Sequence, residues 1–288
     1  MKTTKAVFKS HPVLTFYVLT FVISWGGMLL VLGLDVSQAD SEEIGRLMAL
    51  VYVALLAGPS AAAILLTALL GGTEGLREFG SRLLKWRVGA RWYAVALLSA
   101  PLAALAVLYA LSLTSRDYLP RIVTTGDRAF LVQFSILSAL IVGVFTELGW
   151  TGFAVPRLRV RYGILSTGLI VGLLWGAWQS FVVYWGAGDS PGTLSPAFFL
   201  PAVLFTWLPS FRVLMTWVYD RTGSLLLAML MHTSLIATWT MVTPLTITGW
   251  PLLIYYLAFS AALWVIIAVV AVANRGQLSR RPPELRMA

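Results

Sequence analysis

The chain of 288 residues contains no cysteine. A protein without thiols forms no disulfide, has no thiolate ligand for a metal and carries no palmitoyl group. Two short signatures of hydrolases are also missing, the Gly-x-Ser-x-Gly elbow and the His-Glu-x-x-His helix. The common serine-hydrolase and zinc-protease templates therefore do not describe this sequence.

Charge is scarce as well. Charged residues make up 11% of the chain, whereas hydrophobic residues make up 59%. No soluble domain of this length has enough interior to bury so much apolar surface. The composition therefore predicts that the lipid bilayer surrounds most of the chain.

Long apolar segments predict an all-α polytopic membrane protein. A spanning helix needs about 20 mostly apolar residues, whereas a spanning strand would be an alternating segment of about ten. Eight segments fit the helix: 12–34, 47–70, 93–114, 129–155, 164–187, 196–219, 223–242 and 250–273. The first segment is too long for the core of a signal peptide, so we expect it to remain as the first helix.

The basic residues predict the orientation. Sixteen of the 21 Lys and Arg fall in the two tails and in the second, fourth and sixth connections, four fall in the odd connections, and Arg212 lies within a helix. Because cytoplasmic segments carry the excess of positive charge, we expect a multi-pass protein of the cell membrane with both termini in the cytoplasm. The net charge of +9 then favours membrane lipids as partners, and not nucleic acid.

The chain divides into one membrane domain and two short tails. We expect a cytoplasmic basic tail over 1–11, a single membrane domain over 12–273 and a disordered basic tail over 274–288. Basic residues alternate with apolar ones over 75–92, which predicts an amphipathic helix in the cytoplasmic interface; a solvated basic loop is the alternative.

Three ionisable side chains lie inside the predicted spans: Glu147, Arg212 and His232. A rise of about 1.5 Å per residue places them roughly 12, 10 and 13 Å from the cytoplasmic ends of their helices. Charges inside a bilayer are costly and demand partners, so each of the three is a candidate functional residue.

Two interpretations of these residues remain open. Glu147 and His232 could share a metal ion or position a water, but a catalytic zinc normally takes three protein ligands, and the amide of Gln179 is a poor third. Alternatively, Glu147 and Arg212 form a buried structural ion pair and His232 is a neutral core residue. Six tryptophans within the spans are expected to be packing residues: Trp150, Trp175, Trp178, Trp207, Trp217 and Trp239.

Three motifs in the middle of the chain carry a resemblance. The first is Thr146–Gly152 (TELGWTG) followed by Pro156-Arg157-Leu158, the second is Trp175–Gln179 (WGAWQ), and the third is Thr216–Gly223 (TWVYDRTG) leading to His232. The chain resembles the CPBP family of intramembrane metalloproteases, also called the CAAX protease and bacteriocin-processing (Abi) family. The resemblance implies a bundle with the CAAX protease fold.

The resemblance also implies which positions would be catalytic. In the family pattern a leading Glu activates water, two His help to hold the metal or the water, and an Arg and an Asn support the site. Glu147 and His232 occupy two of the six positions and would be the catalytic and metal-binding residues, with zinc, only if the site is active. The other four positions hold Thr146, Thr151, Gln179 and Ile236 where the family has Glu, Arg, His and Asn.

These replacements favour a non-catalytic binding or scaffold homologue, with no cofactor, whose partners are lipids or the tails of peptides or membrane proteins. An active intramembrane metalloendopeptidase with an altered site built on Glu147 and His232 is the alternative. A transporter that uses Glu147 is a third. Arg212 lies outside the family motifs, and we expect its guanidinium to take over the positive charge of the metal and of the missing Arg.

Overall fold

The computed structural model describes residues 10–33, 41–274 and 278, and within that part of the chain every regular element is a helix. The two predicted tails, 1–11 and 274–288, lie almost entirely outside the described residues. The structure therefore does not test the predicted disorder of the C-terminal tail.

Eight of the described helices are long and apolar enough to cross a membrane. They are α2 (Pro12–Leu32), α3 (Ser41–Leu83), α4 (Ala90–Ser112), α6 (Arg128–Gly149) with its continuation, α8 (Ile164–Gly186), α9 (Pro196–Thr222), α10 (Leu225–Val242) and α11 (Gly249–Ala273). The continuation of α6 consists of a π-helical segment, η3 (Trp150–Ala154), and α7 (Val155–Arg159). The prediction of an all-α polytopic membrane protein is confirmed.

Proline and glycine mark several of the helix ends. Pro12 and Pro196 stand at the first turn of α2 and α9, where a missing N–H costs nothing. Gly223 ends α9 in the left-handed conformation (φ 59°), and its N–H donates to the carbonyl of Tyr219. Between α4 and α6 lie two short helices, η2 (Arg116–Tyr118) and α5 (Arg121–Thr124).

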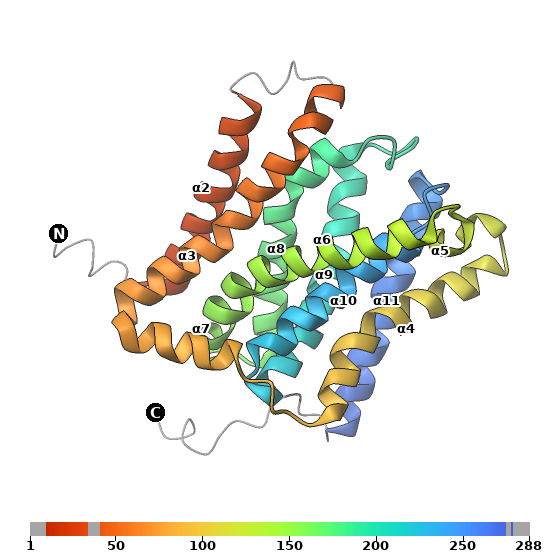
Figure 1. Ribbon diagram of the computed structural model, residues 1–288. Helices are drawn as coiled ribbons and strands as arrows, with labels where there is room; N and C mark the ends of the chain where they lie inside the picture. The colour runs from red at the N-terminus through yellow and green to blue at the C-terminus, as the bar shows by residue number, and fades with distance from the viewer. Residues whose placement is uncertain (1–9, 34–40, 275–277, 279–288) are drawn as a thin grey trace.

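The predicted interfacial helix is present in a shorter form. α3 bends at Gly72 (φ 58°, ψ −149°), and the part after the bend lies across one end of the bundle (Figure 1). This arm ends at Leu83, whereas the amphipathic pattern predicts a helix as far as residue 92. Phe79 of the arm is buried against Leu225 and Met229 of α10, so the arm packs on protein as well as facing outward.

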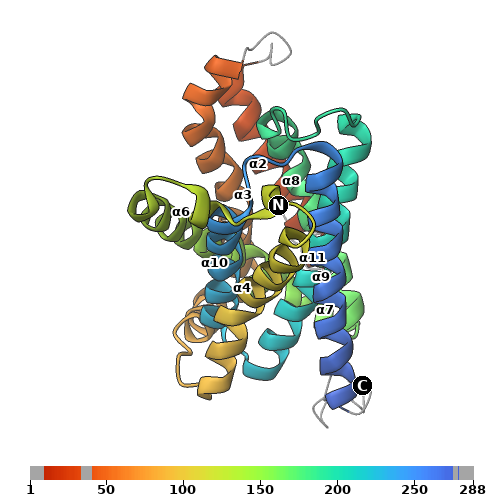
Figure 2. The same ribbon diagram turned by 90° about the vertical axis from the view of Figure 1, so that its right-hand side faces the viewer.

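α9 lies inside the bundle. It contacts α8, α11, α10 and α4, and both ribbon views show it between α8 and α11 (Figures 1 and 2). A proline and an arginine therefore sit in the middle of the protein, Pro209 and Arg212, and both are buried.

Three glycines at intervals of four let α8 approach α9 closely. A Cβ added to Gly168 would lie 2.5 Å from the Cα of Val213, and one added to Gly172 would lie 2.4 Å from the Cα of Pro209. At Gly176 the nearest atom would be in the ring of Phe205, at 3.0 Å. Small residues at this spacing are typical of helix pairs in membranes, because they let two backbones meet.

This contact predicts that Gly172→Ala destabilises the protein. The new methyl group would clash with backbone, which cannot move aside as a side chain can, and overpacking of this kind costs about 1–3 kcal/mol. We expect a lower midpoint of thermal unfolding in detergent micelles.

Gly26→Ala in α2 is the matched control. A Cβ at Gly26 meets nothing within 4 Å, and replacing glycine by alanine in an unstrained helix favours the helix by about 0.5–1 kcal/mol. Equal midpoints for the two variants would contradict the close approach of α8 and α9.

Candidate functional site

Glu147 lies at the centre of a fully buried polar cluster. Nη1 of Arg212 donates to both of its carboxylate oxygens, at 2.9 Å from Oε1 and 2.8 Å from Oε2. Nδ1 of His232 lies 2.6 Å from Oε1, and the hydroxyl of Thr151 donates to Oε2. Three helices, α6, α9 and α10, thus meet through one carboxylate.

The proton on His232 follows from these contacts. An ionised carboxylate that faces a guanidinium only accepts hydrogen bonds, so Nδ1 of His232 carries the hydrogen. In the neutral ring Nε2 is then an acceptor, and it is buried without a hydrogen-bond partner among the described residues. With a neutral imidazole, the cluster contains one negative and one positive charge, which balance.

Arg212 is held by an aromatic face as well as by Glu147. Its Cζ lies 4.4 Å from the centroid of the Trp175 ring, in the position of a cation–π contact. The same ring meets His232 edge to face, with centroids 4.9 Å apart. Nε and Nη2 of Arg212 are buried with no hydrogen-bond partner in the described part of the chain. Trp175 thus forms one wall of the cluster and contacts both of its basic members.

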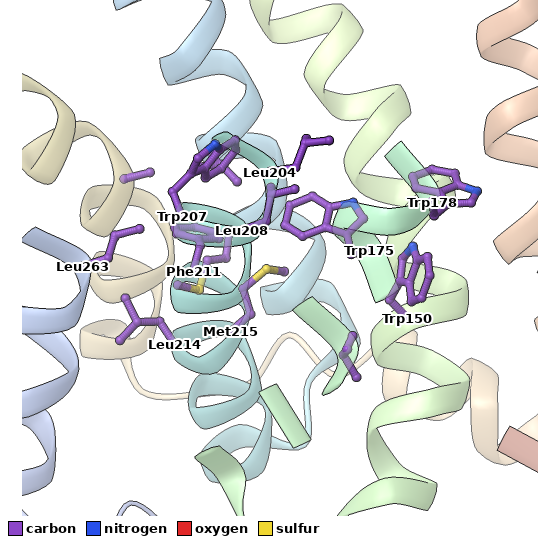
Figure 3. Packing of buried hydrophobic residues seen from close by; sticks show 14 of the residues in the cluster. Trp150, Trp175, Trp178, Leu204, Trp207, Leu208, Phe211, Leu214, Met215 and Leu263 are labelled. Atoms are coloured by element: carbon purple, nitrogen blue, oxygen red, sulfur yellow. The ribbon is translucent and has the colours of Figure 1, made fainter. Parts of the chain in front are cut away.

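More tryptophans enclose the cluster. Trp175 lies 6.4 Å from Trp207 on α9, and Trp150 lies 5.7 Å from Trp178, measured between ring centroids. Figure 3 shows Trp175 with the α9 side chains on one side and Trp150 and Trp178 on the other. All four rings are at most 3% exposed, and the cluster that Trp175 contacts is itself fully buried.

The helix changes form next to Glu147. Residues Trp150–Ala154 make a π-helical turn, and all five are buried. Such turns are rare and occur mostly at functional sites. Thr151 is four residues after Glu147, one turn further along the helix, which brings its hydroxyl to the carboxylate.

The remaining motif positions do not form a site with Glu147. Thr146 is buried and its hydroxyl has no partner among the described residues. Gln179 and Ile236 are partly buried, and neither makes a side-chain hydrogen bond to Glu147. The α8 residue that reaches the cluster is Trp175, one helical turn before Gln179. Trp175 packs in the hydrophobic core, as predicted, and in addition contacts Arg212 and His232.

These residues do not fit a catalytic zinc ion. Such an ion takes three protein ligands, commonly His, Cys, Asp or Glu. No group of three such side chains is present in the described part of the chain. Both oxygens of Glu147 already accept hydrogen bonds, and a cation there would face the guanidinium of Arg212 at contact distance. The position that would need a metal contains a fixed organic cation instead.

The comparisons with known proteins agree with the motifs. A family model described as type II CAAX prenyl endopeptidase Rce1-like matches residues 128–238. That segment runs from the start of α6 into α10 and includes Glu147, Arg212 and His232. This segment is therefore similar to the CAAX protease family. The resemblance stated from the motifs is therefore confirmed.

One curated relative gives the same result at low identity. CAAX prenyl protease 2 of Methanococcus maripaludis is 22% identical over 94 residues, which cover 32% of this chain and 35% of that protein. The match spans about a third of the length of the relative. The similarity to the CAAX protease family is thus shown for the central part of the chain, over residues 128–238.

The buried pair predicts a large and non-additive cost of mutation. Arg212→Met leaves the charge of Glu147 unpaired in an apolar interior, which costs about 3–5 kcal/mol. Replacing both partners, with Glu147→Gln and Arg212→Met together, removes both charges and is expected to cost less than the Arg212→Met change alone. Thermal or denaturant unfolding of the purified variants measures the difference.

Arg77→Met is the matched control. Arg77 and Glu74 form an ion pair at 3.9 Å in which both side chains are more than 80% exposed, and exposed pairs contribute at most about 1 kcal/mol. If Arg212→Met were as stable as Arg77→Met, the structural role of the Glu147–Arg212 pair would be refuted.

Proposed function

We propose that this chain is a member of the CAAX protease family that does not cleave peptides and acts in the membrane by binding. One observation carries the proposal: a buried arginine donates to both oxygens of the surviving motif carboxylate. With the contacts of His232 to Oε1 and Thr151 to Oε2, each oxygen has two partners within the protein, which leaves no acceptor position for a water. Tails of peptides or membrane proteins and lipids are the proposed partners.

Burial supports the same proposal. Glu147, Arg212 and His232 are each 0% exposed, and Thr151 is 1% exposed. For hydrolysis, the general base must lie within about 3 Å of a water that in turn reaches the peptide bond. In the conformation described, Glu147 is enclosed by protein, and the ring of Trp175 packs against its partners Arg212 and His232.

An active metalloendopeptidase is the competing proposal, and one contact favours it. Nδ1 of His232 and Oε1 of Glu147, the two surviving motif side chains, lie 2.6 Å apart. Nε2 of His232 has no partner among the described residues, so it could serve as a ligand. Metal content distinguishes the two proposals, because the non-catalytic one needs no metal.

We expect the purified protein to contain no stoichiometric zinc and His232→Ala to leave its metal content unchanged. Inductively coupled plasma mass spectrometry of protein purified without chelator measures both. Zinc at one equivalent in the parent protein, lost in His232→Ala, would refute the non-catalytic proposal.

Restoring the motif tests the role of Arg212 in the same assay. The variant Thr146→Glu, Thr151→Arg, Gln179→His, Ile236→Asn returns the four family residues, and we expect it to bind zinc only when Arg212→Met is added. Arg212 would otherwise keep its charge beside the metal position. Zinc binding by the restored variant with Arg212 intact would contradict this role.

The distribution of charge supports the proposed orientation. Of the thirteen Lys and Arg in residues 47–274, nine lie at the end of the bundle that holds the start of α2 and the α3–α4, α7–α8 and α9–α10 connections (Figure 1). Three lie at the other end, and Arg212 lies between the ends. We propose that the basic end faces the cytoplasm of a cell-membrane protein, in accord with the positive-inside rule.

The absence of cysteine makes this orientation easy to test. Leu84 is at the basic end and Leu113 at the other end, and each is 74% exposed. In intact cells we expect a membrane-impermeant maleimide to label Leu113→Cys but not Leu84→Cys, and to label both after the cells are opened. The reverse pattern in intact cells would place the basic end outside.

A further inference from the structure

A pocket of about 420 Å³ opens at the basic end of the bundle, away from the Glu147 cluster. It lies between the first turn of α2 and the connection from α7 to α8. Its lining includes His11, Pro12, Leu14, Arg157, Arg161 and Tyr162. We propose that this pocket binds the phosphate headgroup of an anionic phospholipid.

Arg157 is fixed in position for such a ligand. Its Nη1 donates to the carbonyl of Phe153 at 3.0 Å, and its Cζ lies 3.6 Å from the centroid of the Phe153 ring. A guanidinium has five N–H donors, and this bond uses one. Arginine is well suited to phosphate, because its planar set of donors matches two phosphate oxygens.

The charge of the pocket is positive. Arg157 and Arg161 both line it, and neither forms an ion pair with a carboxylate of the described residues. Two charged residues of the α3 arm, Glu78 and Arg82, act electrostatically on Arg157 with opposite sign. They lie 3.8 Å apart and form an ion pair with each other. The nearby charges on the arm therefore cancel, and the two arginines keep a net charge of about +2.

The backbone of α2 adds further donors. His11, at the N-cap of α2, makes no side-chain cap, and Pro12 has no N–H. The helix leaves its first N–H groups without intrahelical partners, and those of Val13 and Leu14 belong to residues that line the pocket. Together with the arginines they favour an anion at this position.

An apolar strip continues from the pocket along α2 and indicates an acyl chain. Leu14, Val18 and Val22 follow one another at intervals of four and are 62%, 53% and 64% exposed. Leu14 belongs to both the pocket and the strip. An amphiphile with a phosphate and a hydrocarbon chain matches this sequence of surfaces, whereas a free phosphate would leave the strip unused. The segment before α2 is a poor occupant, because residues 1–9 contain Lys2, Lys5 and Lys9 and no acidic residue.

The test compares lipid binding by two double variants that lose the same charge at the same end. Arg157→Gln with Arg161→Gln changes the pocket, whereas Arg77→Gln with Arg87→Gln changes the exposed α3 arm and the segment after it. Delipidated protein is titrated with phosphatidylglycerol and, separately, with phosphatidylcholine. Native mass spectrometry counts bound lipids, and thermal unfolding reports stabilisation.

We expect the parent and the arm variant to bind phosphatidylglycerol in preference to phosphatidylcholine. The pocket variant is expected to lose about twentyfold in affinity for phosphatidylglycerol, since each arginine near a charged surface contributes about fivefold. Arg157→Lys with Arg161→Lys keeps the charge and is expected to recover most of the loss. Recovery in this variant, together with an unchanged elution volume of the pocket variant in detergent micelles, distinguishes lost binding from misfolding.

Two results would overturn the proposal. Equal losses in the pocket and arm variants would show a diffuse surface attraction and no site. Displacement of phosphatidylglycerol by inorganic phosphate at equal concentration would show that the pocket takes a free anion and that the α2 strip contributes nothing. Neither result changes the expected metal content, so the lipid-site proposal can be refuted without refuting the non-catalytic function, and the reverse also holds.

Discussion

The arrangement of the central helices depends on one buried carboxylate and the guanidinium that neutralises it. Burying an isolated charge in the interior of a membrane protein raises the free energy of the folded state. A group of opposite charge at hydrogen-bond distance lowers this cost. Arg212 meets Glu147 at 2.8 Å, and neither is exposed. Because the partners come from α9 and α6, the pair fixes the relative rotation and height of two helices whose surfaces are otherwise apolar.

The same pair explains how a protease fold can persist after its motif residues have changed. A metal site holds several helices together through one cation, and removing the metal leaves ligand side chains without a partner. In this chain Arg212 supplies a cation that belongs to the protein itself, and the ring of Trp175 packs against its guanidinium.

Apolar length and basic residues were sufficient to predict the eight helices, and their ends fall within a few residues of the predicted positions apart from α3 and α6. α3 continues beyond its predicted end through a bend at Gly72, and α6 continues through η3 and α7, because a helix can extend into charged residues at which an apolar span ends. For the site, the similar depths of Glu147, Arg212 and His232 in their spans predicted that the three side chains could meet. They do meet, although the helices end at residues other than those used to calculate the depths. The role of Trp175 could not be predicted, because a buried tryptophan in an apolar helix has the same sequence pattern whether it packs against leucine or against arginine.

The π turn at Trp150–Ala154 links two parts of the protein that otherwise share no contact. A π turn holds one residue more than an α turn, so everything after it is rotated by about 100° relative to a continuous α-helix. Glu147 lies before the turn and Arg157 after it, which means that one extra residue sets the direction of the arginine relative to the buried carboxylate. Deleting Ala154, which belongs to neither site, would keep the side chains of both sites and yet rotate Arg157 away from its present neighbours. The number of residues between Glu147 and Arg157 thus determines how the two side chains are oriented relative to each other. Substitutions that keep this number can change one side chain without reorienting the other.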